Sequence, residues 1–148
     1  MISKHEATKL FQLYFPEMKK GNPYQLVDDF SSDKNYRRLR GAIDEFGGGS
    51  TSFDSSQLIA LYDTTFWDSG TEGYLFCTEG FYYKRCKDRG YIRYSNVKSV
   101  TYYNARKSKD SDRGMVISLK DGRSRSIELL ALNATAFISY IEEMAALS

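Results

Sequence analysis

Residues 73–86 read GYLFCTEGFYYKRC. Two runs rich in Tyr and Phe flank the pair Glu79-Gly80, which is typical of the two-residue turn of a β-hairpin. The stretch therefore predicts one strand on each side of this turn, Gly73–Thr78 and Phe81–Cys86. This pairing predicts an antiparallel sheet.

The same pairing places the two cysteines of the chain. Cys77 would face Tyr82 across the hairpin, and Cys86 would lie near Gly73. The two sulfurs would then be roughly 13 Å apart along the ladder, beyond the reach of a disulfide. We expect two thiols, as is usual in the cytosol.

Five further strands are predicted between residues 58 and 129. Each is a short run rich in Tyr, Phe, Ile or Val that ends at a turn signal. The runs are Leu58–Tyr62, Tyr91–Tyr94, Val97–Tyr103, Met115–Leu119 and Arg123–Leu129. The first is almost wholly apolar, as expected of a strand covered on both faces, and Asp121-Gly122 predicts another hairpin turn.

An amphipathic helix, roughly Asn133 to Ala146, closes the chain. Its apolar side carries Phe137, Ile141 and Met144. A helix after an antiparallel sheet can plug the open end of a barrel and cover strand edges. Residues 57–148 therefore predict a seven-stranded antiparallel barrel or sandwich with a C-terminal capping helix.

Residues 1–46 predict a small helical subdomain. Ser3 and Glu6 have the spacing of a capping box, and apolar residues then recur at helical spacing as far as Pro16. A short second helix is expected to open at Pro23, and a third to start at Ser31-Ser32-Asp33 and to stop at the glycines that follow Phe46. Residues 47–56 are small and polar and read as a linker. The predicted fold class is α+β.

Composition is typical of one globular unit. The chain has 148 residues, of which 41% are hydrophobic and 27% charged, with a net charge of +2. This charge is too small to indicate a polyanion partner by itself. The N-terminus lacks the apolar core of a secretion signal, and no apolar run is long enough to cross a bilayer. We expect a cytoplasmic protein.

The order of seven strands and a capping helix resembles the pleckstrin-homology-like (PH-like) superfold. Residues 58–146 are most similar to its bacterial members, in two segments. Leu75–Tyr83 has a turn glycine followed by an aromatic strand, and Tyr94–Val100 has the polar-Val-x-Ser-Val start of a strand. The resemblance implies the fold of this part of the chain and leaves residues 1–46 unassigned.

Phosphoinositide binding, the best-known role of that superfold, is not expected here. The resemblance would place the headgroup against Lys and Arg in the loop of residues 63–71. This loop instead holds Asp63 and Asp68 and lacks a cation. Two carboxylates would repel a phosphorylated headgroup.

The residue inventory also argues against catalysis, metals and cofactors. His5, the single histidine, falls in the first turn of a surface helix, so a Ser-His or Cys-His pair has little to build on. Asp110-Ser111-Asp112 begins like a calcium loop, but Gly114 falls at the fifth position in place of the sixth, and the twelfth position holds Asp121 in place of Glu. The glycines of residues 47–49 lack the Lys that a phosphate-binding loop requires. We expect no enzyme, no metal site and no cofactor.

Three segments are candidates for binding a partner. They are the pair Phe66-Trp67, the cation-and-tyrosine run of residues 82–94, and the charged loop of residues 104–114. Trp67 is the single tryptophan, and it fits either a binding hot spot or the barrel rim. The other two segments fit recognition or simple solvation. The residues expected at a contact are Phe66, Trp67, Tyr82, Arg85, Arg93, Arg106 and Lys107.

The function most consistent with these features is that of a non-catalytic protein-binding module. Its most concrete form is an immunity-type protein that neutralises a toxin by docking on it. The alternative is a peripheral adaptor that binds anionic lipid or nucleic acid through residues 82–94 and 104–114, although the low net charge makes nucleic acid a weaker candidate. The sequence does not specify the partner or the oligomeric state.

Overall fold

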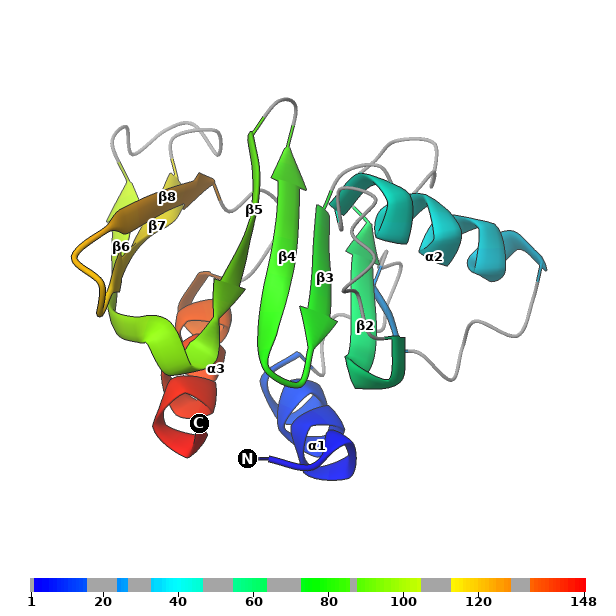
Figure 1. Cartoon of the computed structure of the whole chain (residues 1–148), viewed down its shortest axis with the longest axis horizontal. Coiled ribbons are helices and arrows are strands. Elements are labelled where there is room, and N and C mark those ends of the chain that lie inside the picture. The colour runs from blue at the N-terminus through cyan, green and yellow to red at the C-terminus, as the bar shows by residue number, and fades with distance from the viewer. Residues whose placement is uncertain are drawn as a thin grey trace.

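The chain is α+β, with two antiparallel sheets and three α-helices in the residues that the structure describes (Figure 1). A computed structural model describes residues 2–15, 24–26, 33–46, 55–63, 73–85, 88–104, 113–128 and 134–148. The first sheet has the strand order β1-β2-β3-β4-β5 and the second has the order β6-β7-β8. Sequence neighbours therefore pair throughout both sheets.

The first sheet contains most of the predicted strands. Its members are β1 (Tyr24–Leu26), β2 (Leu58–Asp63), β3 (Gly73–Cys77), β4 (Gly80–Arg85) and β5 (Asp88–Arg93). The predicted strands at residues 58–62, 73–78, 81–86 and 91–94 are thereby confirmed to within a few residues. A short 3-10 turn before β2, η3 (Ser55–Gln57), bonds to the β3–β4 loop, where the Thr78 backbone N–H donates to the Gln57 carbonyl at 2.9 Å.

The second sheet follows directly from the first. A 3-10 turn, η4 (Tyr94–Asn96), joins β5 to β6 (Val97–Asn104), and β7 (Arg113–Leu119) and β8 (Ser124–Glu128) complete the sheet. The predicted turn at Asp121-Gly122 is confirmed between β7 and β8. Gly122 has a φ of +90°, a left-handed conformation that glycine adopts without the steric cost of a Cβ.

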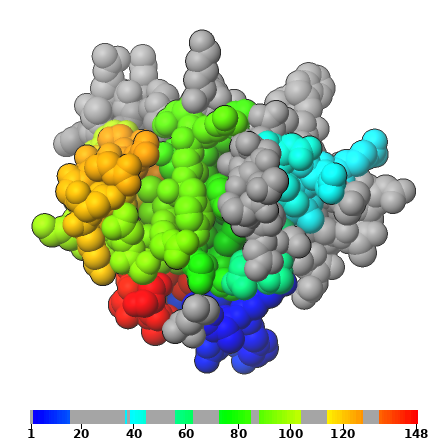
Figure 2. Space-filling view, in the orientation of Figure 1, coloured from blue at the N-terminus to red at the C-terminus, as the bar shows by residue number. Residues whose placement is uncertain are grey.

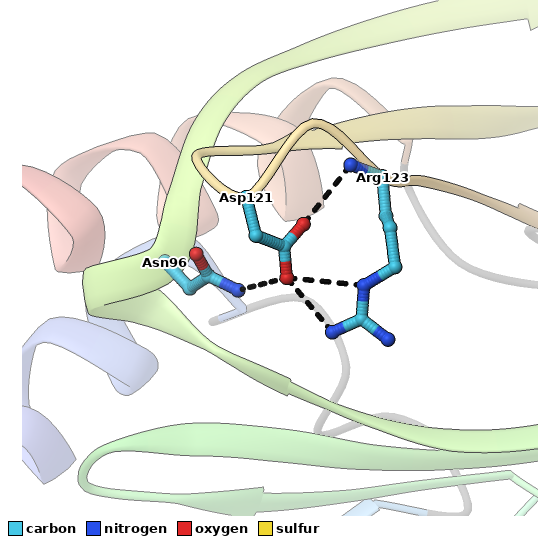
Figure 3. A network of polar contacts seen from close by, with 3 residues as sticks. All are labelled: Asn96, Asp121 and Arg123. Atoms are coloured by element: carbon cyan, nitrogen blue, oxygen red, sulfur yellow. Dashed lines mark hydrogen bonds and ion pairs between the residues drawn. The ribbon is translucent and has the colours of Figure 1, made fainter.

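The Asp121 carboxylate links this turn to η4 (Figure 3). Asp121 accepts hydrogen bonds from the Arg123 backbone N–H at 2.9 Å and from the Arg123 guanidinium at 2.8 and 3.0 Å. The Asn96 amide adds a longer bond of 3.5 Å. These donors stabilise the charged carboxylate and lower the pKa of Asp121 to about 2, with the Arg123 side chain as the largest cause.

The helix α3 (Ala134–Leu147) seals the main core, as the sequence predicts. Phe137, Tyr140, Ile141 and Met144 are completely buried on one face of this helix. They pack against the inner side chains of both sheets, which include Phe76, Phe81, Ile92, Met115 and Ile117. The burial of this apolar face stabilises the closure of the two sheets around the helix.

The helix α1 (Lys4–Tyr14) belongs to the same core. Its predicted capping box is present, because the Ser3 hydroxyl accepts from the Glu6 N–H and the Glu6 carboxylate accepts from the Ser3 N–H. Phe11 and Phe15 are buried, and the Phe11 ring lies 4.9 Å from the ring of Phe76 on β3. The Tyr14 hydroxyl donates to the Glu143 carboxylate on α3.

The helix α2 (Asp33–Phe46) covers the opposite face of the first sheet. Leu39 and Ala42 pack with a second cluster formed by Leu58, Leu61, Leu75, Cys77 and Tyr82. The predicted helical subdomain of residues 1–46 is therefore not confirmed, because α1 and α2 lie on opposite faces of one sheet. This coverage also explains why β2 is apolar on both faces, as predicted.

Two local predictions are wrong. A second helix is expected after Pro23, but Tyr24–Leu26 forms the edge strand β1, with Tyr24 opposite Tyr62. The β3–β4 hairpin pairs Leu75 with Tyr82 and Phe76 with Phe81, so four residues connect the last pair in place of two. Cys77 accordingly does not face Tyr82. Cys86 and Asn133, the predicted N-cap of the last helix, lie outside the described residues.

Candidate functional site

The outer surfaces of β4 and β5 form the candidate site. Side chains of Phe81, Tyr83 and Ile92 point into the main core, so their neighbours along each strand point outward. The antiparallel register then sets outward residues directly opposite one another: Tyr82 faces Tyr91, Lys84 faces Arg89, and Gly80 faces Arg93. We call Tyr82, Lys84, Arg89, Tyr91 and Arg93 the β4–β5 face.

This face lies beside α2. Tyr82 is half-buried because its ring packs at the margin of the cluster that α2 covers. Tyr91 is 37% exposed and Arg93 is also exposed, so the cover ends between the two tyrosines. In Figure 2 the surface of β4 and β5 (green) is visible between the second sheet and α2 (cyan).

The two tyrosines are stacked on each other. Their ring centroids are 4.5 Å apart and the rings are tilted by 36°. Burial raises the pKa of Tyr91 to about 12 and also raises the pKa of Tyr82. Both phenols therefore stay protonated at neutral pH, when each presents apolar ring area and a hydroxyl that donates a hydrogen bond.

Gly80 provides the space in which Tyr91 rests. A Cβ at this position would lie 2.6 Å from the Tyr91 hydroxyl oxygen and 2.2 Å from the Ile92 carbonyl oxygen. The Tyr91 ring thus leans across the β4 backbone where no side chain intervenes. The glycine is required for this close approach, and not for the two-residue turn that the sequence indicates.

Cations flank the tyrosine pair on both sides. Arg93 lies 3.8 Å from the Glu79 carboxylate, a loose ion pair between side chains that are 59% and 39% exposed. On the other side, Lys84 and Arg89 are directly opposite each other across the two strands. This end of the β4–β5 face therefore carries two basic side chains side by side.

Two of the seven predicted contact residues come together on this face, Tyr82 and Arg93. The Arg85 backbone pairs with Asp88 at the end of the hairpin, but its side chain is outside the described residues. Phe66, Trp67, Arg106 and Lys107 also lie outside them, together with most of residues 104–114. Their roles stay predictions.

Sequence reasoning missed Tyr91, Lys84 and Arg89 as members of one surface. All three lie in the run of residues 82–94, but their grouping depends on the β4–β5 register. The signal available was the alternation of the two strands, because pairing Arg85 with Asp88 sets Tyr82 opposite Tyr91.

The described residues bring together no group of three His, Cys, Asp or Glu side chains able to hold a metal ion. His5 is an exposed residue in the first turn of α1. None of the described helices combines the length and the apolar character that crossing a bilayer requires.

Comparison with known proteins returned no match to this chain. This holds for protein-family models, for curated proteins and for solved structures alike.

Proposed function

We propose that this protein is a non-catalytic, PH-like module that binds one protein partner through the β4–β5 face. Support for the PH-like part comes from the element order. Four consecutive antiparallel strands, β2 to β5, are followed by three more, β6 to β8, and then by a helix packed between the sheets. The strand β1 and the helices α1 and α2 would be additions to that core.

The observation that carries the binding proposal is the stacked pair Tyr82 and Tyr91, partly exposed on a rigid sheet between cations. Tyr and Arg are enriched at the centres of protein interfaces because they combine apolar area with hydrogen bonding. β4 is held by ladder bonds on both sides, and β5, the last strand of the sheet as described, is held on one side. Residues on such strands lose little conformational entropy on binding. The face is therefore prepared for contact before a partner arrives.

The partner surface should be apolar opposite the two tyrosines and acidic around them. Carboxylates on the partner would complement the cations Lys84, Arg89 and Arg93 of the β4–β5 face. Of these, Arg93 lies 3.8 Å from Glu79, in a loose ion pair between exposed side chains.

The concrete form of the proposal is immunity-type inhibition, in which one toxin domain docks on the β4–β5 face and is blocked by it. A stoichiometric inhibitor benefits from a pre-formed surface, because little binding energy is lost in ordering it. The first experiment is purification from the native host at physiological salt. One stoichiometric protein partner is expected, and its loss from Tyr91→Ala would assign the face.

The matched control for Tyr91→Ala is Tyr102→Ala. Tyr102 is a 45% exposed tyrosine on β6, in the other sheet. Tyr91→Ala should weaken the complex by about 30-fold, corresponding to about 2 kcal/mol, while Tyr102→Ala should leave the affinity unchanged. Equal losses from both variants, or no loss from either, would contradict the proposal.

The alternative is an adaptor for anionic lipid or nucleic acid, and the facing cations Lys84 and Arg89 favour it. Salt separates the two functions. Polyanion binding should fall by orders of magnitude between about 50 and 200 mM salt, whereas a complex centred on tyrosines should lose much less. Recovery of nucleic acid or lipid that is released at the higher salt would support the adaptor.

A further inference from the structure

A second apolar surface lies between the outer side of α1 and the C-terminal end of α3. A hollow of about 580 Å³ separates the outer side of α1 from the end of α3, and its lining residues are Ile2, Glu6, Lys9, Leu10, Leu13 and Leu147. Leu13 is 70% exposed and Leu147 is 49% exposed. Figure 2 shows α1 (blue) and α3 (red) together at the lower end of the molecule, away from the centre of the β4–β5 face.

The core accounts for only part of this surface, because Ile2 and Leu10 pack against it whereas Leu13 and Leu147 stay exposed. The side of α1 that enters the core carries Ala7 and Phe11, both completely buried. Leu13 lies on the other side, where an apolar residue gains nothing from folding of a single chain. One exposed leucine is ordinary, but several apolar residues around one hollow indicate an interaction surface.

The lining residues at positions 2, 6, 9 and 13 have a spacing that is the same in both chain directions, while the two charges exchange places. Ile2, Glu6, Lys9 and Leu13 are spaced by four, three and four residues, so they follow one side of the helix and its N-terminal extension. The order is apolar, acidic, basic, apolar. An antiparallel copy of the helix therefore presents the complementary residue at each position.

We propose that two copies of this chain associate through α1 in an antiparallel pair with twofold symmetry. With the axis between Ala7 and Thr8, Glu6 of each copy lies opposite Lys9 of the other, and Ile2 lies opposite Leu13. Leu10 and Leu147 then extend the apolar contact on each side. An interface of this type is isologous, since the same patch serves both copies.

The capping box keeps Glu6 available for this contact. Both hydrogen bonds that its carboxylate accepts from Ser3 fall on Oε2, which fixes the side chain at the exposed start of α1. The Ser3 bonds, with smaller contributions from His5 and Lys9, lower the pKa of Glu6. The carboxylate is therefore charged at neutral pH, as pairing with Lys9 requires.

This inference is independent of the proposed function. It uses α1 and the end of α3, and it leaves Tyr82 and Tyr91 on the first sheet uncovered. Each dimer would therefore carry two copies of the β4–β5 face. The patch is small, so we expect a weak dimer of the transient class.

Sedimentation velocity of the full chain tests the association directly, from about 10 µM to about 1 mM, a range that covers weak interfaces. The wild type should shift from monomer to dimer within this range. Leu13→Asp places a charge in the apolar contact and should weaken association by at least about tenfold. Tyr102→Asp, an equally drastic change at an exposed residue of the second sheet, should leave it unchanged.

Exchanging the charges at positions 6 and 9 gives a sharper test, because it separates an effect on the contact between copies from an effect on folding. Glu6→Lys sets lysine against lysine, and Lys9→Glu sets glutamate against glutamate, so each variant alone should remain monomeric. A mixture of the two variants restores opposite charges at both positions and should form a heterodimer. Glu6→Lys also removes the capping box, so its folded state is verified by circular dichroism before mixing.

A wild type that stays monomeric at 1 mM overturns the proposal, as does a dimer that Leu13→Asp leaves intact. Two single variants that dimerise as well as the wild type overturn the antiparallel arrangement. Monomeric protein that co-sediments with anionic vesicles through Leu13 would reassign the surface to a membrane.

Discussion

The rings of Tyr94 and Tyr140 meet edge to face in the middle of the core, with centroids 6.0 Å apart and planes at 90°. Both residues are completely buried. Within the described residues, neither hydroxyl makes a hydrogen bond of good geometry. Burial raises the pKa of both phenols well above the ordinary value, so two neutral polar groups remain inside an apolar core.

Replacing both tyrosines by phenylalanine should therefore stabilise the protein. The variant Tyr94→Phe/Tyr140→Phe keeps the ring packing and removes two poorly bonded hydroxyls, so the free energy of unfolding should rise by about 1 kcal/mol. Urea unfolding monitored by circular dichroism measures it, with Tyr102→Phe on the surface as the control. A loss of stability would mean that the hydroxyls bind each other or a buried water.

Phe11→Ala tests whether α1 is part of the common core. Phe11 is completely buried among Phe15, Phe76 and Tyr140, so truncation should cost about 3–5 kcal/mol. Leu13→Ala, two residues along the same helix, should change stability by less than about 0.5 kcal/mol at low protein concentration. Hydrogen exchange of β4 amides should accelerate in the first variant. Exchange that accelerates in α1 alone would indicate an independent helical subdomain.

Gly80→Ala should destabilise the protein and disturb the β4–β5 face. The new methyl group would meet the Ile92 carbonyl and the Tyr91 ring, so we expect a loss of about 1–3 kcal/mol. In Gly122→Ala nothing lies within 4 Å of the new methyl group, and the cost of about 1 kcal/mol comes from the positive φ alone. Chemical shifts of the Tyr91 ring should move in Gly80→Ala and not in Gly122→Ala. An unmoved Tyr91 in both would contradict this account of Gly80.

Asp121 should contribute to stability above its ordinary pKa and lose that contribution in acid. Its carboxyl has a pKa of about 2 in the folded protein and 3.8 as the ordinary value. The unfolded chain therefore binds the proton first, and the contribution is complete above about pH 4 and disappears as the pH falls through about 2. Asp121→Asn should flatten the dependence of the urea midpoint on pH between about 5 and 2.

The control for this acid titration is Asp44→Asn, which changes an exposed carboxylate on α2. It should retain the steep dependence of the wild type. If Asp121→Asn titrates like the wild type, the Arg123 and Asn96 bonds do not persist in solution.

Most strands and helices could be predicted from the sequence because their signals are local. The capping box of Ser3 and Glu6 and the glycine at position 122 each depend on a few adjacent residues. The strand β1 could not be predicted, because its signal is not local. Tyr24–Leu26 is a strand because it pairs with Ala60–Tyr62, a partner that no local window contains.

The predicted β3–β4 register is wrong because it, too, depends on residues distant in sequence. Glu79-Gly80 has the residues of a two-residue turn, but the Glu79 carbonyl accepts from the Tyr94 N–H at 2.9 Å, and Gly80 pairs with Arg93. Hydrogen bonds to the end of β5 thus make these residues part of the β4–β5 ladder. The candidate site could not be predicted for the same reason, because the alignment of Tyr82 with Tyr91 follows from this ladder and not from their spacing alone.

The packing of α1 on α3 sets the order in which the chain can fold. Tyr14 and its hydrogen-bond partner Glu143 are 129 residues apart in sequence. During synthesis the aromatic side of α1 is therefore without its helical partner until all of the described strands have been made. Closing so long a loop slows folding, and Phe11 and Phe15 are meanwhile accessible to chaperones. A nascent chain stalled before residue 134 should accordingly be bound by chaperones through its first helix.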